Sequence, residues 1–174
     1  MNIFDIHSHL LPGVDDGANN LEVSLQMAKQ AVANHVSKII VTPHFSFKYQ
    51  CLSDLMALKQ VYCDFKEQLD INEIPLTIYF GLEILYSDEL LDYLKDKKIK
   101  GINDTNYLLI EFEFDVSGEA LISALAKIKA YGYNPILAHP ERYFTIWNNF
   151  EILECLVFEN IYFQCNAASL TGKF

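Results

Sequence analysis

The sequence predicts an α/β fold, either a parallel sheet or an incomplete (β/α) barrel. Short apolar runs rich in β-branched residues alternate with longer stretches of helical period. No linker rich in serine, glycine or proline interrupts them, so we expect one domain over residues 1–174. A chain of 174 residues, 51% hydrophobic and 21% charged, suits a single compact domain and excludes disorder as the main state.

Six strands are expected from the apolar runs. The first precedes a loop of proline, glycine and aspartate, the second is stopped by Pro43, and the third follows Pro75. The fourth is rich in leucine and isoleucine, and the fifth ends at His139. The expected strands cover residues 2–6, 37–42, 77–82, 107–112, 135–138 and 161–165.

Helices are expected between these strands, because apolar residues recur there at helical spacing. Asn19, three residues before Glu22, marks the start of the first helix in a pattern like a capping box. Ser87 caps the third helix, and Ser117 precedes the fourth, which Gly132 ends. The second, third and last helices cover residues 52–69, 88–97 and 150–158.

An excess of acidic residues argues against two classes of partner. Lysine and arginine number 13 against 23 aspartate and glutamate, and the net charge of −10 would repel nucleic acid or an anionic membrane surface. The sequence has no basic region leading into an apolar run and no apolar stretch approaching about 18 residues. We therefore expect a cytoplasmic protein that binds no nucleic acid and does not insert into membranes. Four cysteines without paired spacing are expected to be free thiols: Cys51, Cys63, Cys155 and Cys165.

Polar residues lie at the ends of the first five predicted strands, where α/β folds gather their functional groups. His7 and His9 are two apart in an extended segment, so both imidazoles can reach one ion. Alone, such a pair is equally typical of an incidental polar strand end. The strand-end residues are His7, His9, His44, Glu83, Glu111 and His139.

The full set favours a metal site over separate polar strand ends. Carboxylates such as Glu83 and Glu111 are costly beside buried strands unless they are paired or coordinated, and no lysine adjoins either. Only His35 of the five histidines falls elsewhere, while Glu113 stays an alternative ligand. Imidazole and carboxylate ligands without thiolate suit manganese, iron or zinc, and two glutamates able to bridge ions favour a multinuclear centre. Such a centre activates water and binds a phosphoryl oxygen.

Two further groups have less specific patterns. Asp15 and Asp16 lie in a turn bounded by Gly17, and turn chemistry explains either aspartate taken alone. Aromatic residues near Arg142 can wall a pocket for an aromatic ring, although such clusters more often belong to a core. They are Tyr131, Tyr133, Tyr143, Phe144 and Trp147.

Several short motifs, taken in order, resemble those of the PHP (polymerase and histidinol phosphatase) superfamily. Within it, the sequence is similar to the bacterial manganese-dependent protein tyrosine phosphatases linked to capsule and exopolysaccharide synthesis. The motifs are Asp5-Ile6-His7-Ser8-His9, Asp15-Asp16-Gly17, Thr42-Pro43-His44, Gly81-Leu82-Glu83-Ile84, Leu109-Ile110-Glu111-Phe112, His139-Pro140-Glu141-Arg142 and Gln164-Cys165-Asn166-Ala167. The resemblance covers nearly the whole chain and implies a distorted, incomplete (β/α) barrel of PHP type with about six parallel strands.

The same resemblance implies a centre of two or three manganese ions, with iron or zinc as alternatives. Its metal ligands would be His7, His9, Asp16, His44, Glu83, Glu111 and His139. Arg142 matches an arginine that holds the substrate phosphate, and Arg142 and His44 are the catalytic residues of this assignment. The implied activity is hydrolysis of phosphotyrosine in protein by metal-activated hydroxide. The implied partner is a bacterial tyrosine autokinase of a capsule or exopolysaccharide system.

The chain ends before an Asp-x-His element that the family carries on a further strand. We therefore expect a domain without its last strand and helix, and one weakened metal position. An open strand edge favours altered oligomerisation, a homo-oligomer included, or pairing with another chain. Two alternatives stay open: a PHP-type phosphatase of a small phosphate monoester such as histidinol phosphate, or a catalytically weak remnant that binds metal or a partner. No cysteine precedes an arginine at Cys-x5-Arg spacing, which excludes the cysteine-based phosphatase route.

Overall fold

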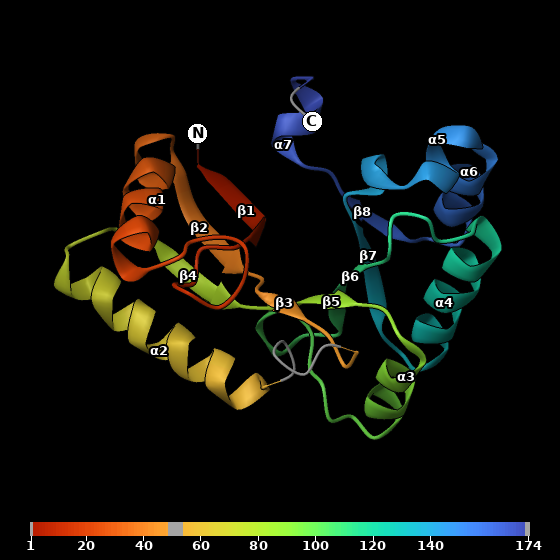
Figure 1. Ribbon diagram of the computed structural model, residues 1–174, viewed down its shortest axis with the longest axis horizontal. Coiled ribbons are helices and arrows are strands. Elements are labelled where there is room, and N and C mark those ends of the chain that lie inside the picture. The colour runs from red at the N-terminus through yellow and green to blue at the C-terminus, as the bar shows by residue number, and fades with distance from the viewer. Residues whose placement is uncertain (1, 49–53, 173–174) are drawn as a thin grey trace. The chain divides into compact units, whose positions relative to one another are not determined.

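The computed structural model describes residues 2–48 and 54–172. The chain divides into two compact units, one ending at Glu83 and the other beginning at Ile84 (Figure 1). Each unit contains parallel strands and helices, so the predicted α/β class is confirmed. The expectation of one domain over residues 1–174 stays a prediction.

The N-terminal unit has a three-stranded parallel sheet in the order β1-β2-β4. Its elements are β1 (Ile3–Ser8), α1 (Leu21–Ala33), β2 (Val36–Val41), β3 (His44–Phe45), α2 (Leu55–Ile71) and β4 (Thr77–Phe80). Ala28 of α1 and Phe65 of α2 lie in one buried cluster with Ile39, Val41 and Ile78 of the sheet. Burying each large apolar side chain contributes about 1.5–3 kcal/mol, so this cluster fixes the helices on the sheet.

Side-chain caps define where these two helices begin. Asn20, rather than the predicted Asn19, caps α1, and its Oδ1 accepts a hydrogen bond from the Val23 N–H at 3.0 Å. The capping residue is one position later than predicted, because only Asn20 lies immediately before the first helical turn. Asp54 caps α2 in the same way, and the predicted start of that helix at residue 52 lies outside the described residues.

The C-terminal unit carries the parallel strands β6, β7 and β8, with β5 next to β6. Its first elements are β5 (Glu83–Leu85), whose first residue still belongs to the N-terminal unit, α3 (Asp88–Lys95), η2 (Ile102–Asp104), β6 (Tyr107–Glu111), α4 (Gly118–Ala130) and β7 (Asn134–Ala138). They are followed by η3 (Pro140–Arg142), α5 (Phe144–Asn148), α6 (Glu151–Phe158), β8 (Tyr162–Gln164) and α7 (Ala167–Leu170). The residues of β6 and β7 pair from Tyr107 with Asn134 to Ile110 with Leu137.

The six predicted strands correspond to β1, β2, β4, β6, β7 and β8, with ends shifted by at most two residues. Parallel pairing joins them within each unit, which confirms the prediction of about six parallel strands for the described part of the chain. Gly132 follows the end of α4 with a φ of +85°, a conformation that glycine adopts without strain. Ser87 occupies the N-cap position of α3 but makes no side-chain capping bond. The short β3, β5, η3, α5 and α7 were not predicted, because they contain too few residues to show a period.

Two smaller expectations can be compared with the structure. Cys63, Cys155 and Cys165 are free thiols, as predicted, whereas Cys51 lies outside the described residues. Within residues 2–48 and 54–172, no helix combines the length and apolar character needed to cross a membrane.

Candidate metal centre and anion site

The C-terminal end of β1 brings two imidazoles together. His7 lies in the strand and His9 just beyond it, and their Nε2 atoms are 3.2 Å apart. Alternation along an extended strand places residues two apart on one face, which is the prediction made for this pair. The shared face of His7 and His9 is therefore confirmed.

Glu83 is the centre of the ionisable cluster in the N-terminal unit. Its side chain is 1% exposed, and its Oε2 lies 2.9 Å from His7 Nε2 and 3.1 Å from His9 Nε2. His44 Nδ1 lies 3.3 Å from the same oxygen. The predicted third strand ends before Glu83, which instead begins β5, and its N–H donates to the carbonyl of Pro43. One buried carboxylate oxygen is thus surrounded by three imidazole nitrogens.

Asp15 has a structural role that its turn pattern did not reveal. Its side chain is 2% exposed, and Oδ2 accepts hydrogen bonds from His9 Nδ1 at 2.8 Å and from the His44 N–H at 3.2 Å. Oδ1 accepts from the Gly17 N–H at 3.1 Å, so the predicted turn chemistry is also present. A carboxylate on one ring nitrogen fixes the orientation of the imidazole and directs Nε2 toward Glu83. Nothing in the local sequence distinguishes this aspartate from Asp16.

The loop that carries Asp15 lies directly against His9. A Cβ atom at Gly17 would lie 2.2 Å from the His9 carbonyl oxygen and 2.4 Å from the His9 Cβ. The Ala18 N–H also donates to that carbonyl at 3.2 Å. Only glycine permits this close approach, so Gly17 serves the packing of the loop on β1 in addition to the turn.

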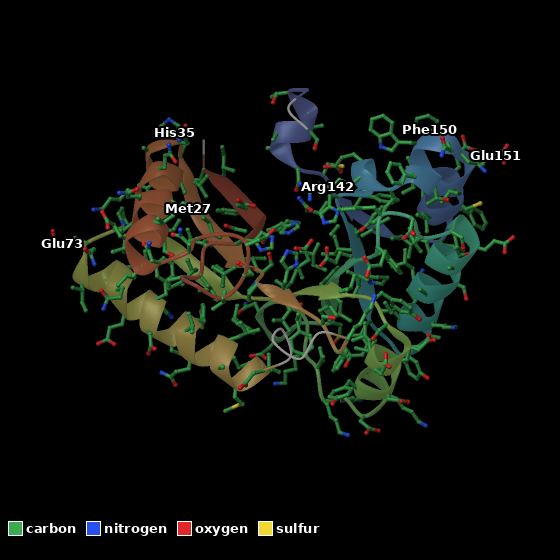
Figure 2. All side chains as sticks on the ribbon, viewed as in Figure 1. Met27, His35, Glu73, Arg142, Phe150 and Glu151 are labelled. Atoms are coloured by element: carbon green, nitrogen blue, oxygen red, sulfur yellow. The ribbon has the colours of Figure 1, made fainter. Side chains whose placement is uncertain are left out.

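Asp16 and His44 extend the cluster toward solvent. Asp16 is 79% exposed, and its Oδ1 lies 3.4 Å from His44 Nε2. Within the N-terminal unit, two groups of potential metal ligands result, His7 with His9 and Glu83, and His9 with Asp16 and His44. Within each group the ligand atoms lie within 4.8 Å of one another. His35, at the end of α1 (Figure 2), belongs to neither group, as predicted.

The spacing of these atoms fits a cation. Atoms that bind one ion at about 2.0–2.2 Å stand roughly 2.8–3.6 Å apart in octahedral or tetrahedral arrangements. The contacts of Glu83 with the three histidines, at 2.9, 3.1 and 3.3 Å, fall in that range. The Nε2 atoms of His7 and His9, 3.2 Å apart, also have the separation of two ligand atoms on one ion.

The charges around His9 favour a positive species. Burial lowers the pKa of His9, but hydrogen bonds and charges from Asp15 and Glu83 outweigh it and raise the pKa to about 10. Burial raises the pKa of Asp15, yet its hydrogen bonds with His9, Gly17 and His44 bring the pKa below the ordinary value. The carboxylates therefore stabilise a positive charge here, either a proton on His9 or a metal ion.

The remaining predicted ligands meet in the C-terminal unit. Glu111 ends β6 and His139 follows β7, and His139 Nε2 lies 3.8 Å from Glu111 Oε2. His139 is 3% exposed and has a φ of 33°, a left-handed conformation that is strained for this residue. Glu113, the alternative ligand, is exposed.

The left-handed turn at His139 leads into η3 and to Arg142 (Figure 2). Arg142 is the only arginine of the sequence, since the 13 basic residues otherwise are lysines. Its side chain is exposed, and no hydrogen bond or ion pair of its guanidinium occurs among the described residues. Exposed guanidinium groups without a carboxylate partner are suited to bind a phosphate bidentately.

The aromatic residues near Arg142 separate into two kinds. Tyr133 and Tyr143 are buried and belong to the core, where the Tyr143 hydroxyl accepts the Phe112 N–H at 3.1 Å. Phe144 and Trp147 are 64% and 58% exposed and line a cavity that also includes Arg142. The hypothesis of an aromatic pocket thus applies to Phe144 and Trp147, while Tyr131 is not among the lining residues.

The chain is similar to known proteins over nearly its whole length. A profile of the family "Capsular polysaccharide synthesis, CpsB/CapC" matches residues 3–174. The chain is 35% identical to the putative tyrosine-protein phosphatase CapC of Staphylococcus aureus, with 98% of this chain and 66% of CapC covered. It is 34% identical to the tyrosine-protein phosphatase YwqE of Bacillus subtilis, with 99% of this chain and 67% of YwqE covered.

A solved structure of the same group is also similar. It comes from work on YwqE of Bacillus subtilis and CpsB of Streptococcus pneumoniae, described as unique metal-dependent tyrosine phosphatases. The TM-score is 0.89 at 34% identity, and the match covers 98% of this chain and 68% of the other. The chain therefore spans about two thirds of the length of these relatives.

Proposed function

Because the chain belongs to the CpsB/CapC family of capsular polysaccharide synthesis proteins, we propose that it is a metal-dependent phosphatase that hydrolyses phosphotyrosine in proteins. The observation that carries this proposal is the convergence of His7, His9 and His44 on the Glu83 carboxylate. The similarity to metal-dependent tyrosine phosphatases, at a TM-score of 0.89, supports it.

Histidines and acidic residues predicted from the sequence would hold the metal. In the N-terminal unit these are His7, His9, Asp16, His44 and Glu83, and in the C-terminal unit they are Glu111 and His139. Their ligand atoms are imidazole nitrogens and carboxylate oxygens, without thiolate. These ligand types suit manganese, with iron or zinc as alternatives, and we propose two or three ions per chain.

Metal ions bound there would polarise the phosphoryl oxygens and lower the pKa of water. Arg142 would neutralise the phosphate, because two parallel N–H groups of a guanidinium match two phosphate oxygens. His44, whose side chain is 24% exposed, is held on its backbone by Asp15 and so keeps its ring beside Glu83. Asp15 orients His9 through Nδ1. We therefore assign the direct roles to Arg142 and His44 and a positioning role to Asp15.

The proposed partner is a phosphotyrosine protein, in particular a tyrosine autokinase of a capsule or exopolysaccharide system. The family description supports the link to capsular polysaccharide synthesis, and the names of the relatives support tyrosine phosphate as the substrate. We also propose self-association, since the sheet edge at β1 exposes Ile3, Phe4 and Ile6.

The deciding experiment measures manganese-dependent phosphate release from a phosphotyrosine peptide, with the metal content determined on the same sample. The double variant His7→Ala/His9→Ala should lose both metal and turnover. His35→Ala, which removes the histidine outside the site, should retain both. Full turnover by the double variant would refute the proposal.

A second set of substrates tests the runner-up function, a phosphatase of small phosphate monoesters. Rates on the phosphotyrosine peptide and on histidinol phosphate are compared under the same metal conditions. Faster turnover of histidinol phosphate would favour the runner-up. Metal bound at one ion or fewer per chain, with no turnover of either substrate, would instead favour a metal-binding protein without catalytic function.

A further inference from the structure

Tyr143 contacts both segments that carry the predicted metal ligands of the C-terminal unit. The elements concerned, β6, β7 and α5, all belong to this unit (Figure 1). Tyr143 is fully buried, and its carbonyl accepts the N–H groups of Ile146 and Trp147 in the first turn of α5, at 3.1 and 3.2 Å. A buried tyrosine usually places its hydroxyl on a polar partner, so the contacts of this side chain identify what it holds.

The hydroxyl of Tyr143 holds the main chain directly after Glu111. The Phe112 N–H donates to it at 3.1 Å in a buried environment. The carbonyl of the same peptide group, which belongs to Glu111, accepts the Tyr86 N–H at 2.9 Å. The paired residues of β6 and β7 end at Ile110, so this peptide group lies beyond their ladder. Because a peptide group is planar and both of its ends are bonded, the main chain from which the Glu111 side chain projects is fixed.

The ring of Tyr143 packs against the imidazole of His139. The ring centroids are 5.8 Å apart and the planes are tilted by 41°, which is within the roughly 4.5–7 Å range of favourable aromatic pairs. The main chain of His139, with its φ of 33°, is held by two hydrogen bonds. Its N–H donates to the Gln164 carbonyl at 2.7 Å, and its carbonyl accepts the Arg142 N–H at 2.9 Å. A strained backbone persists where its surroundings hold it, and Tyr143 adds a contact that orients the side chain.

We propose that Tyr143 is a positioning residue that holds Glu111 and His139 in place to bind a metal ion. The two side chains come from the ends of different strands, β6 and β7, and Glu111 Oε2 lies 3.8 Å from His139 Nε2. The inference rests on the proposed function, because it takes both residues as ligands, and it goes further by naming a residue that acts through them. Loss of a group that orients metal ligands typically lowers metal affinity by about 10–100-fold.

The chain offers a matched control, Tyr133. Its hydroxyl donates to the Ile99 carbonyl at 3.0 Å, and this bond is buried like that of Tyr143. Tyr133 lies just before β7, whereas His139 follows the other end of that strand. Tyr143→Phe and Tyr133→Phe therefore each remove one buried hydroxyl that bonds the main chain, and urea unfolding should show similar losses of stability. Only Tyr143→Phe removes a contact with a segment that carries a predicted ligand.

Hydrogen exchange in the metal-free chain tests the contact itself. In Tyr143→Phe, the amide hydrogen of Phe112 should exchange faster by about three- to tenfold, the factor expected for loss of one hydrogen bond. In Tyr133→Phe its exchange rate should stay the same. An unchanged rate in Tyr143→Phe would overturn the proposal, because the hydroxyl would not hold the peptide group after Glu111.

Zinc, a diamagnetic ion among those proposed for the centre, is the probe for the ligands. The free zinc concentration is set with a chelator buffer, and the ring-nitrogen NMR signal of His139, identified by its loss in His139→Gln, reports coordination of this side chain. The concentration that shifts half of this signal should rise by about tenfold in Tyr143→Phe. In Tyr143→Leu, which also removes the ring, it should rise by up to about 100-fold, with circular dichroism to establish that this variant is folded. Tyr133→Phe should leave the concentration unchanged.

Three outcomes of the zinc titration would overturn the proposal. The first is an equal zinc concentration in the unaltered chain and in Tyr143→Phe. The second is an equal rise in Tyr133→Phe, which would identify a general effect of lost stability. The third is a His139 signal that zinc does not shift in the unaltered chain, since His139 would then not be a ligand.

Phosphate release from a phosphotyrosine peptide distinguishes a failure of this inference from a failure of the proposed function. Metal-dependent release together with unchanged zinc binding at His139 in both Tyr143 variants would refute the positioning role and leave the phosphatase function standing. No release by the unaltered chain, together with zinc binding at His139 that Tyr143→Phe weakens, would refute the phosphatase function and leave the positioning role standing.

Discussion

The two units of the chain hold their ionisable groups in contrasting ways. In the N-terminal unit, the Glu83 carboxylate oxygen has three imidazole nitrogens within 3.3 Å, and Asp15 holds His9 from the other side. In the C-terminal unit, His139 and Glu111 are 3.8 Å apart, and Arg142 lies exposed beside aromatic side chains. The first arrangement is a cluster of imidazoles around one buried carboxylate, whereas the second combines a looser carboxylate–imidazole pair with an exposed guanidinium. The difference shows that the loops after the strands of one α/β chain can hold ionisable groups either in a buried cluster or exposed to solvent.

The largest expected effect follows from removing the central carboxylate. Glu83→Gln keeps the size of the side chain but removes the charge that the three histidines share. We expect the affinity for manganese to fall by more than about 100-fold, beyond the loss typical of residues outside the ligand set. Metal content and isothermal titration measure this loss.

Glu73→Gln provides the control for that variant, because Glu73 is an exposed glutamate just after α2 (Figure 2). It should bind manganese normally. If Glu83→Gln also retained its metal, the cluster around Glu83 would not be the cation site, and the two units would not differ in this property.

A smaller effect is expected from the positioning carboxylate. In Asp15→Asn the side chain can still accept hydrogen bonds but no longer carries the charge beside His9 Nδ1. Loss of such a partner typically lowers metal affinity by about 10–100-fold. Manganese affinity at fixed pH is the measurement, with Asp70→Asn, an exposed aspartate on α2, as the control. An unchanged affinity would show that Asp15 serves the turn alone.

The smallest expected effects are on the free energy of unfolding, when one glycine of each unit is replaced by alanine. Gly17→Ala places a Cβ 2.2 Å from the His9 carbonyl oxygen, so the loop must move and the free energy of unfolding should fall by about 1–3 kcal/mol. Gly132→Ala meets no neighbour within 4 Å but has a φ of +85°, and should cost about 1–2 kcal/mol through backbone strain. Urea unfolding measures both.

Affinity for manganese distinguishes these two variants further. Only Gly17→Ala should weaken manganese binding, because only Gly17 lies against a predicted ligand. Equal affinities in the two variants would show that the packing of the loop on His9 has no influence on the cation site.

Much of the fold and of the clustering of His7 and His9 followed from the sequence. Strand alternation placed His7 and His9 on one face, and apolar runs located the strands to within two residues. The family resemblance is confirmed by the CpsB/CapC match over residues 3–174. These predictions succeeded because periodicity and strand ends are local properties of the chain.

Other features depended on contacts that no local pattern contains. Asp15 and Asp16 occupy the same turn, yet one is buried against His9 and the other is 79% exposed. Tyr143 and Phe144 are neighbours in sequence, yet one belongs to the core and the other lines the cavity. Which neighbour turns inward is decided by tertiary packing, and the sequence alone does not contain that choice.

The contacts of Asp15 also have a consequence for the timescale on which the loop opens. Its carboxylate holds the main-chain amides of Gly17 and His44 as well as the ring of His9, so these three groups are released together. Gly17 lies outside every helix and strand, where amide hydrogens ordinarily exchange with solvent quickly. We expect the amide hydrogen of Gly17 to exchange slowly. If its exchange rate rises together with the dissociation rate of a bound ion, this one amide reports how often the loop around Asp15 opens.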